Sequence, residues 1–248
     1  MTIDNVIVLS AGQGSRLRPL TDHCPKCMVK FQGRTLLEHQ LEIYQKYGLG
    51  DVTVVCGYES SSVKADGIRK VVNEDFSTTN MVHSLFCAEE FMNGNLLIAY
   101  GDIVFKPEVV GSILEGKGDI RVVVDRCWRE LWSQRMENPL ADAETMKLVD
   151  GDRIKELGKK PQSYDEIEGQ YIGMVLISKE VIEQVKEHYQ SLDRNAQYDG
   201  KSFGNMYMTS FVQGLIDAGF DVRASFIDGG WLEFDEPGDL ALQFVTAS

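Results

Sequence analysis

The stretch Leu9–Lys30, LSAGQGSRLRPLTDHCPKCMVK, continues directly from a run of four apolar residues, Val6–Leu9. Such a run is typical of a buried parallel strand. Gly12 and Gly14 allow positive φ angles, so the backbone N–H groups after the strand can point inward and form an anion-binding loop. Four cations follow the loop in an otherwise acidic chain: Arg16, Arg18, Lys26 and Lys30. A glycine loop with several cations predicts a site for a polyphosphate.

The size and charge of the chain limit what it can be. Its 248 residues are enough to bury a real core, and we expect one domain over residues 1–248. The net charge of −13 argues against a nucleic acid or an anionic membrane surface as partner. The sequence contains no pattern of a signal peptide and no apolar stretch near the ~20 residues of a membrane span. Together with five scattered cysteines, read as reduced thiols, this predicts a cytoplasmic protein.

Apolar runs and helical periodicity alternate along the chain. Strands are predicted at 6–9, 52–56, 68–72, 96–100, 120–124, 170–177 and 222–227, with a DG-turn hairpin between 145–149 and 153–157. Helices are predicted at 36–47, 81–92, 107–115, 179–191, 204–218 and 236–245. This alternation predicts an α/β fold with a doubly wound, mostly parallel sheet.

An aspartate closes one of the predicted strands. Asp102 lies in the turn Tyr100-Gly101-Asp102, at the carboxyl end of strand 96–100. Open α/β sheets bind their ligands just outside these ends. Asp102 is therefore a candidate for the site, and the alternative is that it only caps the turn.

Two tryptophans occupy a polar segment, DRCWRELWSQRMENP. Trp128 and Trp132 are spaced i,i+4, so in a helix they share one face. Such a pair could stack on a cationic or amide head group. It could equally clamp a lid or form a dimer contact, and aromatic residues belong to the core more often than to ligand cages. The same question applies to Tyr100, Tyr171 and Trp231.

The first motif is long enough to resemble a known family. A strand, then Ala-Gly-x-Gly-x-Arg-Leu-x-Pro-Leu-Thr, Pro25-Lys26 and Met28-Val29, resembles the signature loop of nucleotidyltransferases that join an NTP to a sugar phosphate or a small phospho-alcohol. The segment Asn80–Leu85, NMVHSL, is similar to cytidylyltransferases that act on phosphocholine and related compounds. The resemblance implies a Rossmann-like, GT-A-like fold with a small β extension over the acceptor side. It divides the domain into a nucleotide-binding half, about 1–125, and an acceptor-binding half, about 126–248.

The resemblance also implies roles for charged residues. Arg16 would hold the β- and γ-phosphates, and Lys26 would lie between the α-phosphate and the incoming phosphate. Asp102 and Asp235, the latter in WLEFDEPGDL, match the positions that hold Mg²⁺. Two aspartates and phosphate oxygens suit this ion, which takes oxygen ligands. If the register is shifted, the alternatives to Asp235 are Glu233 and Asp239.

Further residues are implied on the nucleotide and acceptor sides. The glycine loop and the start of the helix at 80 would line the nucleotide pocket, with these residues: Leu9, Ala11, Gly12, Gln13, Gly14, Ser15, Asn80 and Ser84. For Asn80, capping of the helix is the alternative role. On the acceptor side, the lysine-proline element at 159–161 resembles the one that places a lysine, here Lys160, near the acceptor phosphate. Four aromatic residues are further candidates for acceptor binding: Tyr171, Trp128, Trp132 and Trp231.

The implied reaction is the Mg²⁺-dependent transfer of CMP from CTP to a small phosphomonoester or phosphonate, with release of pyrophosphate. Phosphocholine, 2-aminoethylphosphonate and phosphoglutamine are the acceptor types, and a role in cell-surface polysaccharide biosynthesis is implied. The alternatives are a sugar-1-phosphate nucleotidyltransferase that uses UTP, dTTP or GTP, and a non-catalytic nucleotide-binding regulatory subunit. The presence of Arg16, Lys26, Asp102 and Asp235 together argues against the last. A homo-oligomer is compatible with the sequence.

Overall fold

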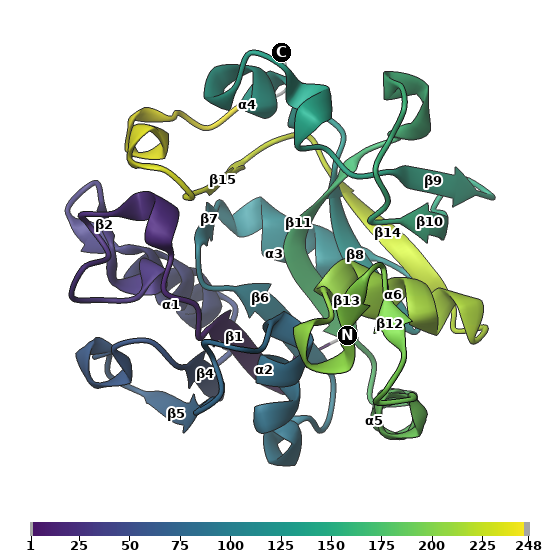
Figure 1. Ribbon diagram of the computed structural model, residues 1–248, viewed down its shortest axis with the longest axis horizontal. Coiled ribbons are helices and arrows are strands. Elements are labelled where there is room, and N and C mark those ends of the chain that lie inside the picture. The colour runs from purple at the N-terminus through teal and green to yellow at the C-terminus, as the bar shows by residue number, and fades with distance from the viewer. Residues whose placement is uncertain (1, 246–248) are drawn as a thin grey trace.

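The computed structural model describes residues 2–245 of the chain. A nine-stranded sheet lies at its centre (Figure 1). Its strands are β1 (Asn5–Ser10), β4 (Val52–Cys56), β5 (Ile68–Val72), β6 (Leu96–Tyr100), β8 (Ile120–Asp125), β9 (Met146–Val149), β10 (Arg153–Leu157), β11 (Gln170–Ile177) and β14 (Val222–Ile227). Their order is β5-β4-β1-β6-β11-β8-β14-β10-β9, and only β11 and β10 run against the others. The predicted mostly parallel sheet is confirmed.

Helices cover both faces of this sheet, as the doubly wound prediction requires. They are α1 (Leu36–Lys46), α2 (Met81–Cys87), α3 (Pro107–Glu115), α4 (Trp128–Arg135), α5 (Ile182–Ser191) and α6 (Met208–Asp217). Side chains alternate along β1, so that Val6 and Val8 pack into the cluster under α1, α3 and α4, whereas Ile7 and Leu9 pack into the cluster under α2, α5 and α6. Among the helices of residues 2–245, none is long and apolar enough to cross a membrane.

The carboxyl ends of β1 and β6 lie next to each other. The two strands pair in parallel with Leu9 opposite Tyr100, and the Gly101 N–H donates a hydrogen bond of 2.9 Å to the Leu9 carbonyl. The glycine loop that follows β1 and the Asp102 turn that follows β6 therefore meet at one edge of the sheet.

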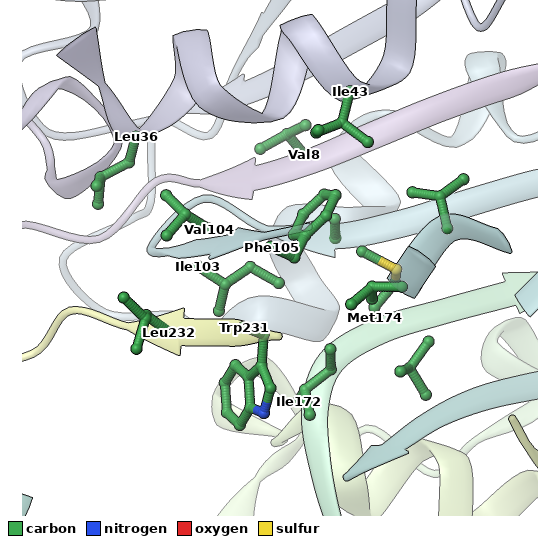
Figure 2. Packing of buried hydrophobic residues seen from close by; sticks show 14 of the residues in the cluster. Val8, Leu36, Ile43, Ile103, Val104, Phe105, Ile172, Met174, Trp231 and Leu232 are labelled. Atoms are coloured by element: carbon green, nitrogen blue, oxygen red, sulfur yellow. The ribbon is translucent and has the colours of Figure 1, made fainter. Parts of the chain in front are cut away.

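A short ladder adds a third segment to this edge. Strand β7 (Ile103–Phe105) pairs antiparallel with β15 (Trp231–Glu233), and the Phe234 N–H donates to the Asp102 carbonyl at 3.0 Å. Figure 2 shows residues of both strands within one buried cluster. This ladder brings the WLEFD segment alongside the Asp102 turn. It was not predicted, because three-residue strands offer too few positions for a period-2 pattern.

Several helix boundaries differ from the sequence-based expectation. The closing helix predicted at 236–245 is wrong, since only a 3₁₀ helix, Pro237–Ala241, forms there. The chain is extended after this turn, and the Val245 carbonyl accepts a hydrogen bond from the Gly230 N–H at 2.8 Å. α5 and α6 begin three and four residues later than predicted, and α2 stops at Cys87 before a 3₁₀ turn.

Candidate active site

The glycine loop sets the path of the Lys26 side chain. Gly14 has φ +66°, and a Cβ atom built on it would lie 2.4 Å from the Lys26 Cγ. A larger residue would therefore be strained in its backbone and would also displace the lysine. Thr21 fixes the loop from the other side, because its hydroxyl donates to the Gly14 carbonyl at 2.8 Å. The loop thus directs Lys26 toward the end of β6.

Lys26 lies between two aspartates that are distant in sequence. Its Nζ is 3.0 Å from the Asp102 Oδ2 and also bonds the Asp235 Oδ1, while the Arg16 Nη2 lies 3.1 Å from the same Asp235 oxygen. Burial alone would lower the pKa of Lys26, but the two carboxylates outweigh burial and raise it above its usual value. The structure therefore brings together Arg16, Lys26, Asp102 and Asp235.

Three carboxylates at this point could hold a divalent cation. Asp102, Glu233 and Asp235 each offer one oxygen within 4.8 Å of the others. The Asp102 Oδ1 is buried and has no hydrogen-bond partner in residues 2–245, which leaves one carboxylate oxygen open to a ligand. Burial and the nearby Asp235 raise the pKa of Glu233, although Arg135 opposes this shift. Carboxylate oxygens are the ligands that Mg²⁺ prefers, so these residues fit such an ion.

Arg135, the last residue of α4, ties the carboxylates to one another. Its side chain is only 6% exposed and lies 2.6 Å from Glu233, 3.2 Å from Asp239 and 3.4 Å from Asp235. Asp239 in turn accepts the Asp235 N–H at 2.7 Å. Asp239, an alternative metal ligand in the sequence, thus holds the backbone instead of joining the three-carboxylate group. Arg135 was missed because its ion-pair partners all lie more than 90 residues away along the chain.

A first cavity, of about 260 Å³, opens over the glycine loop and the start of α2. Of the eight predicted nucleotide-binding residues, Gln13 alone is absent from its lining. The lining consists of Leu9, Ser10, Ala11, Gly12, Gly14, Ser15, Arg16, Lys26, Phe76, Thr79, Asn80, Met81, Ser84 and Asp102. Ser10, Phe76, Thr79 and Met81 were not predicted, although each adjoins a predicted residue or segment.

Asn80 caps α2 as well as lining the first cavity. Its side-chain oxygen accepts the Met81 N–H at 2.8 Å, and its own N–H donates to the Gly204 carbonyl at 2.9 Å. The Ser84 hydroxyl donates to the Asn80 carbonyl at 3.3 Å and accepts from the Asn73 amide at 3.0 Å. The capping role and the position at the cavity therefore coexist in this residue.

A second cavity, of about 220 Å³, lies on the Asp235 side of Lys26. Three of the predicted acceptor-binding residues line it: Tyr171, Trp132 and Trp231. Asp125 holds Trp231 in place, since its carboxylate accepts the indole N–H at 2.8 Å. The full lining is Met81, Tyr100, Trp132, Asp142, Glu144, Gln170, Tyr171, Ile172, Gly173, Tyr207, Met208, Thr209, Trp231, Glu233 and Asp235.

Two predicted acceptor residues do not line this cavity. Trp128 is buried, with its ring 6.0 Å from that of Trp132 and 6.2 Å from that of Tyr164, so the i,i+4 pair turns one indole to the cavity and one to the core. The Lys160 ammonium bonds the carbonyls of Leu140 and Ala141.

Glu144 is a member of the second cavity that was not predicted. Burial, together with Asp142 and Asp199, raises its pKa to about 7, while Lys160 acts in the opposite direction. Its backbone is held by Gln170, whose side chain exchanges hydrogen bonds of 3.0 and 2.6 Å with the Glu144 N–H and carbonyl.

We expect Glu144→Gln to become progressively more stable than the parent as the pH rises from 5 to 8. The carboxyl ionises near its ordinary pKa in the unfolded chain but only near 7 in the folded one, so ionisation costs the parent stability across this window. Glutamine cannot ionise and escapes that cost. Thermal unfolding at several pH values measures the difference in stability between the variant and the parent, and Glu187→Gln on the exposed face of α5 is the control. A difference that does not change with pH would contradict the assignment.

The chain matches a family and several known proteins. A family model described as the MobA-like NTP transferase domain matches residues 6–201. The CTP:phosphoglutamine cytidylyltransferase of Campylobacter jejuni subsp. jejuni serotype O:2 is 42% identical over 250 residues, which cover 96% of this chain and 98% of that protein. The choline-phosphate cytidylyltransferase of Streptococcus pneumoniae is 31% identical over 104 residues, covering 40% of this chain and 45% of that protein.

A solved structure with low sequence identity to this chain has the same fold. The inositol-1-phosphate CTP transferase from T. maritima superposes with a TM-score of 0.73 over 96% of this chain and 92% of that one. The sequences are 22% identical, so this likeness speaks for the shared α/β architecture alone.

Proposed function

The chain belongs to the MobA-like NTP transferase family and is a nucleotidyltransferase, and we propose that it transfers CMP from CTP to a small phosphorylated or phosphonate acceptor, releasing pyrophosphate. One geometric observation supports this most directly. The ion pairs of Lys26 and Arg16 with Asp235 join the wall of the first cavity to that of the second. A nucleotide in the first cavity and an acceptor in the second would therefore meet at Lys26.

The residues at this junction suit a reaction driven by positioning and charge. An acceptor phosphate oxygen must approach the α-phosphorus in line with the leaving pyrophosphate, and both partners are anions. Lys26 would neutralise charge between them, and the more exposed Arg16 would contact the outer phosphates. The attacking oxygen is already ionised, so no general base is required. His83, inside the α2 segment, accordingly has no catalytic role in this proposal.

The three-carboxylate group would hold a divalent cation, which we propose to be Mg²⁺. Such an ion would supply Lewis-acid stabilisation of charge on the transferred phosphoryl group. Asp102 reaches this point from the end of β6 and Asp235 from the segment after β15. Arg135 keeps the second carboxylate in place.

A pyrophosphate-release assay tests the proposal. CTP, UTP, GTP and dTTP are each combined with phosphocholine, 2-aminoethylphosphonate, phosphoglutamine or glucose 1-phosphate in the presence of Mg²⁺. We expect CTP with one of the first three acceptors to react fastest, and excess EDTA to stop the reaction. Equal or faster turnover of UTP, GTP or dTTP with the sugar phosphate would favour a sugar-1-phosphate nucleotidyltransferase. Binding of nucleotide without turnover of any pair would favour a regulatory protein.

A further inference from the structure

The second cavity carries negative charge on its walls. Among the described residues that line it there are four carboxylates and no lysine, arginine or histidine: Asp142, Glu144, Glu233 and Asp235. Cations neutralise two of these carboxylates at the end of the second cavity that adjoins the first cavity. Arg135 contacts both Glu233 and Asp235, and Lys26 also contacts Asp235. The other two belong to the segment between α4 and β9.

Glu144 is the uncompensated charge of that segment. Asp142 is exposed to solvent and accepts the Trp132 indole N–H at 3.1 Å. The Glu144 carboxylate, by contrast, makes no hydrogen bond or ion pair with any of residues 2–245, although Gln170 fixes its backbone on both sides. Lys160 is near enough to influence it, but its ammonium is bonded to two backbone carbonyls outside the cavity lining. A partly buried carboxylate without a partner suits a cationic ligand.

Aromatic rings connect Glu144 to the junction. The rings of Tyr100 and Tyr171 meet edge to face at 5.7 Å, and the pKa of each is raised by burial, with Glu144 and Asp102 both adding to the shift. The tyrosine pair therefore lies within electrostatic reach of both carboxylates. Gly173, with φ +84°, permits this packing, since a Cβ there would lie 2.5 Å from the Tyr100 ring. The Tyr171 hydroxyl is buried without a hydrogen-bond partner in the described chain.

We propose that the second cavity accepts the ammonium end of the acceptor, with Glu144 as its counter-charge and the aromatic walls as its lining. Carboxylates and aromatic faces both attract such cations, and an acceptor whose far end is neutral or purely anionic gains nothing from Glu144. The proposal rests on the proposed function, because it takes the second cavity as the acceptor site. It assigns specificity to a residue that would touch the acceptor but not the reacting atoms.

Matched acceptors test this directly. Phosphocholine is compared with 3,3-dimethylbutyl phosphate, its uncharged isostere, 2-aminoethylphosphonate with propylphosphonate, and phosphoglutamine with its analogue lacking the α-amino group. We expect kcat/KM to favour the ammonium member of at least one pair by about 10- to 100-fold, the scale of a charge-assisted contact. Glu144→Gln should remove most of that preference, because it lowers kcat/KM for the ammonium member more than for its uncharged counterpart. Glu187→Gln serves as the control.

The outcomes separate this inference from the proposed function. Turnover with CTP but no preference for the ammonium member in any pair would overturn the inference and leave the cytidylyltransferase intact. A Glu144→Gln enzyme that loses activity equally on both members of a pair would also overturn it, because a structural role would affect both alike. If no acceptor reacts, calorimetric titration of the same pairs decides: absence of binding by every ammonium member counts against both proposals.

Discussion

Lys26→Ala is expected to lower kcat/KM for CTP by at least ~10²-fold, the scale of losing one preorganised charge contact to a transition state. Gly14 leaves room for the aliphatic part of the Lys26 side chain, and Asp102 and Asp235 hold its ammonium at the boundary of the two cavities. No other described lysine lines either cavity, and the neighbouring Arg16 is assigned to the outer phosphates, so it would not replace the Lys26 charge between the two substrates. Steady-state kinetics measure the loss. Lys30→Ala, four residues further along and exposed in β2 (Lys30–Phe31), should retain activity.

The same substitution should strengthen divalent-cation binding to the nucleotide-free protein. Lys26 offsets the negative charges of Asp102 and Asp235, and these carboxylates repel each other once the ammonium is gone. We therefore expect Lys26→Ala to unfold at a lower temperature than the parent, and Mn²⁺ to recover most of that loss. Titration of free Mn²⁺ by electron paramagnetic resonance measures the affinity. Near-native turnover, or weaker Mn²⁺ binding, would show that Lys26 does not have this position in solution.

The parts of the fold that could be predicted are those with a strong local signal. The apolar runs at 6–9, 52–56 and 120–124 mark buried strands whatever surrounds them, and the Asp150-Gly151 pair marks its hairpin through two positive φ angles. The ladder of β7 with β15 has no such signal, because it is held by pairing between residues 126 to 130 positions apart. The closing helix was also predicted wrongly, and the chain there is tied to a segment outside it, since the Gly230 N–H donates to the Val245 carbonyl.

In the candidate site, too, the residues that could be predicted are those with a local sequence signal. Asp102 and the glycine loop with Arg16 follow strands whose carboxyl ends meet, so topology predicts that they converge. Lys26 lies 16 residues beyond the end of β1, and its place came from the family resemblance. Asp235 could be placed there only through a family resemblance, because β15 is not visible as a strand in the sequence. Arg135 and Glu144 are not part of any recognised motif, and their importance arises from burial and from the charges around them. Residues of this kind become candidates only once the tertiary contacts are known.

Asp102→Asn and Asp235→Asn are expected to weaken divalent-cation binding at least ~10-fold and to lower kcat/KM by ~10²-fold or more. Each substitution replaces a carboxylate oxygen within the three-residue group by a neutral amide of the same shape. The Asp102 substitution should affect metal binding more selectively than the Asp235 substitution. The Asp102 Oδ1 has no partner in residues 2–245, whereas Asp235 also holds Arg16 and Arg135. Asp235→Asn therefore combines loss of a ligand with loosening of both arginines.

Direct Mn²⁺ titration in the presence of CTP separates these effects from activity. For Asp102→Asn, the loss of affinity should account for the loss of rate, so saturating metal should restore a large part of kcat. For Asp235→Asn, saturating metal should restore less, because Lys26 and Arg16 have lost their common anchor. Asp66→Asn, at an exposed position between β4 and β5, should change neither quantity. Normal metal affinity in both active-site variants would mean that these carboxylates hold Lys26 and the arginines rather than the ion.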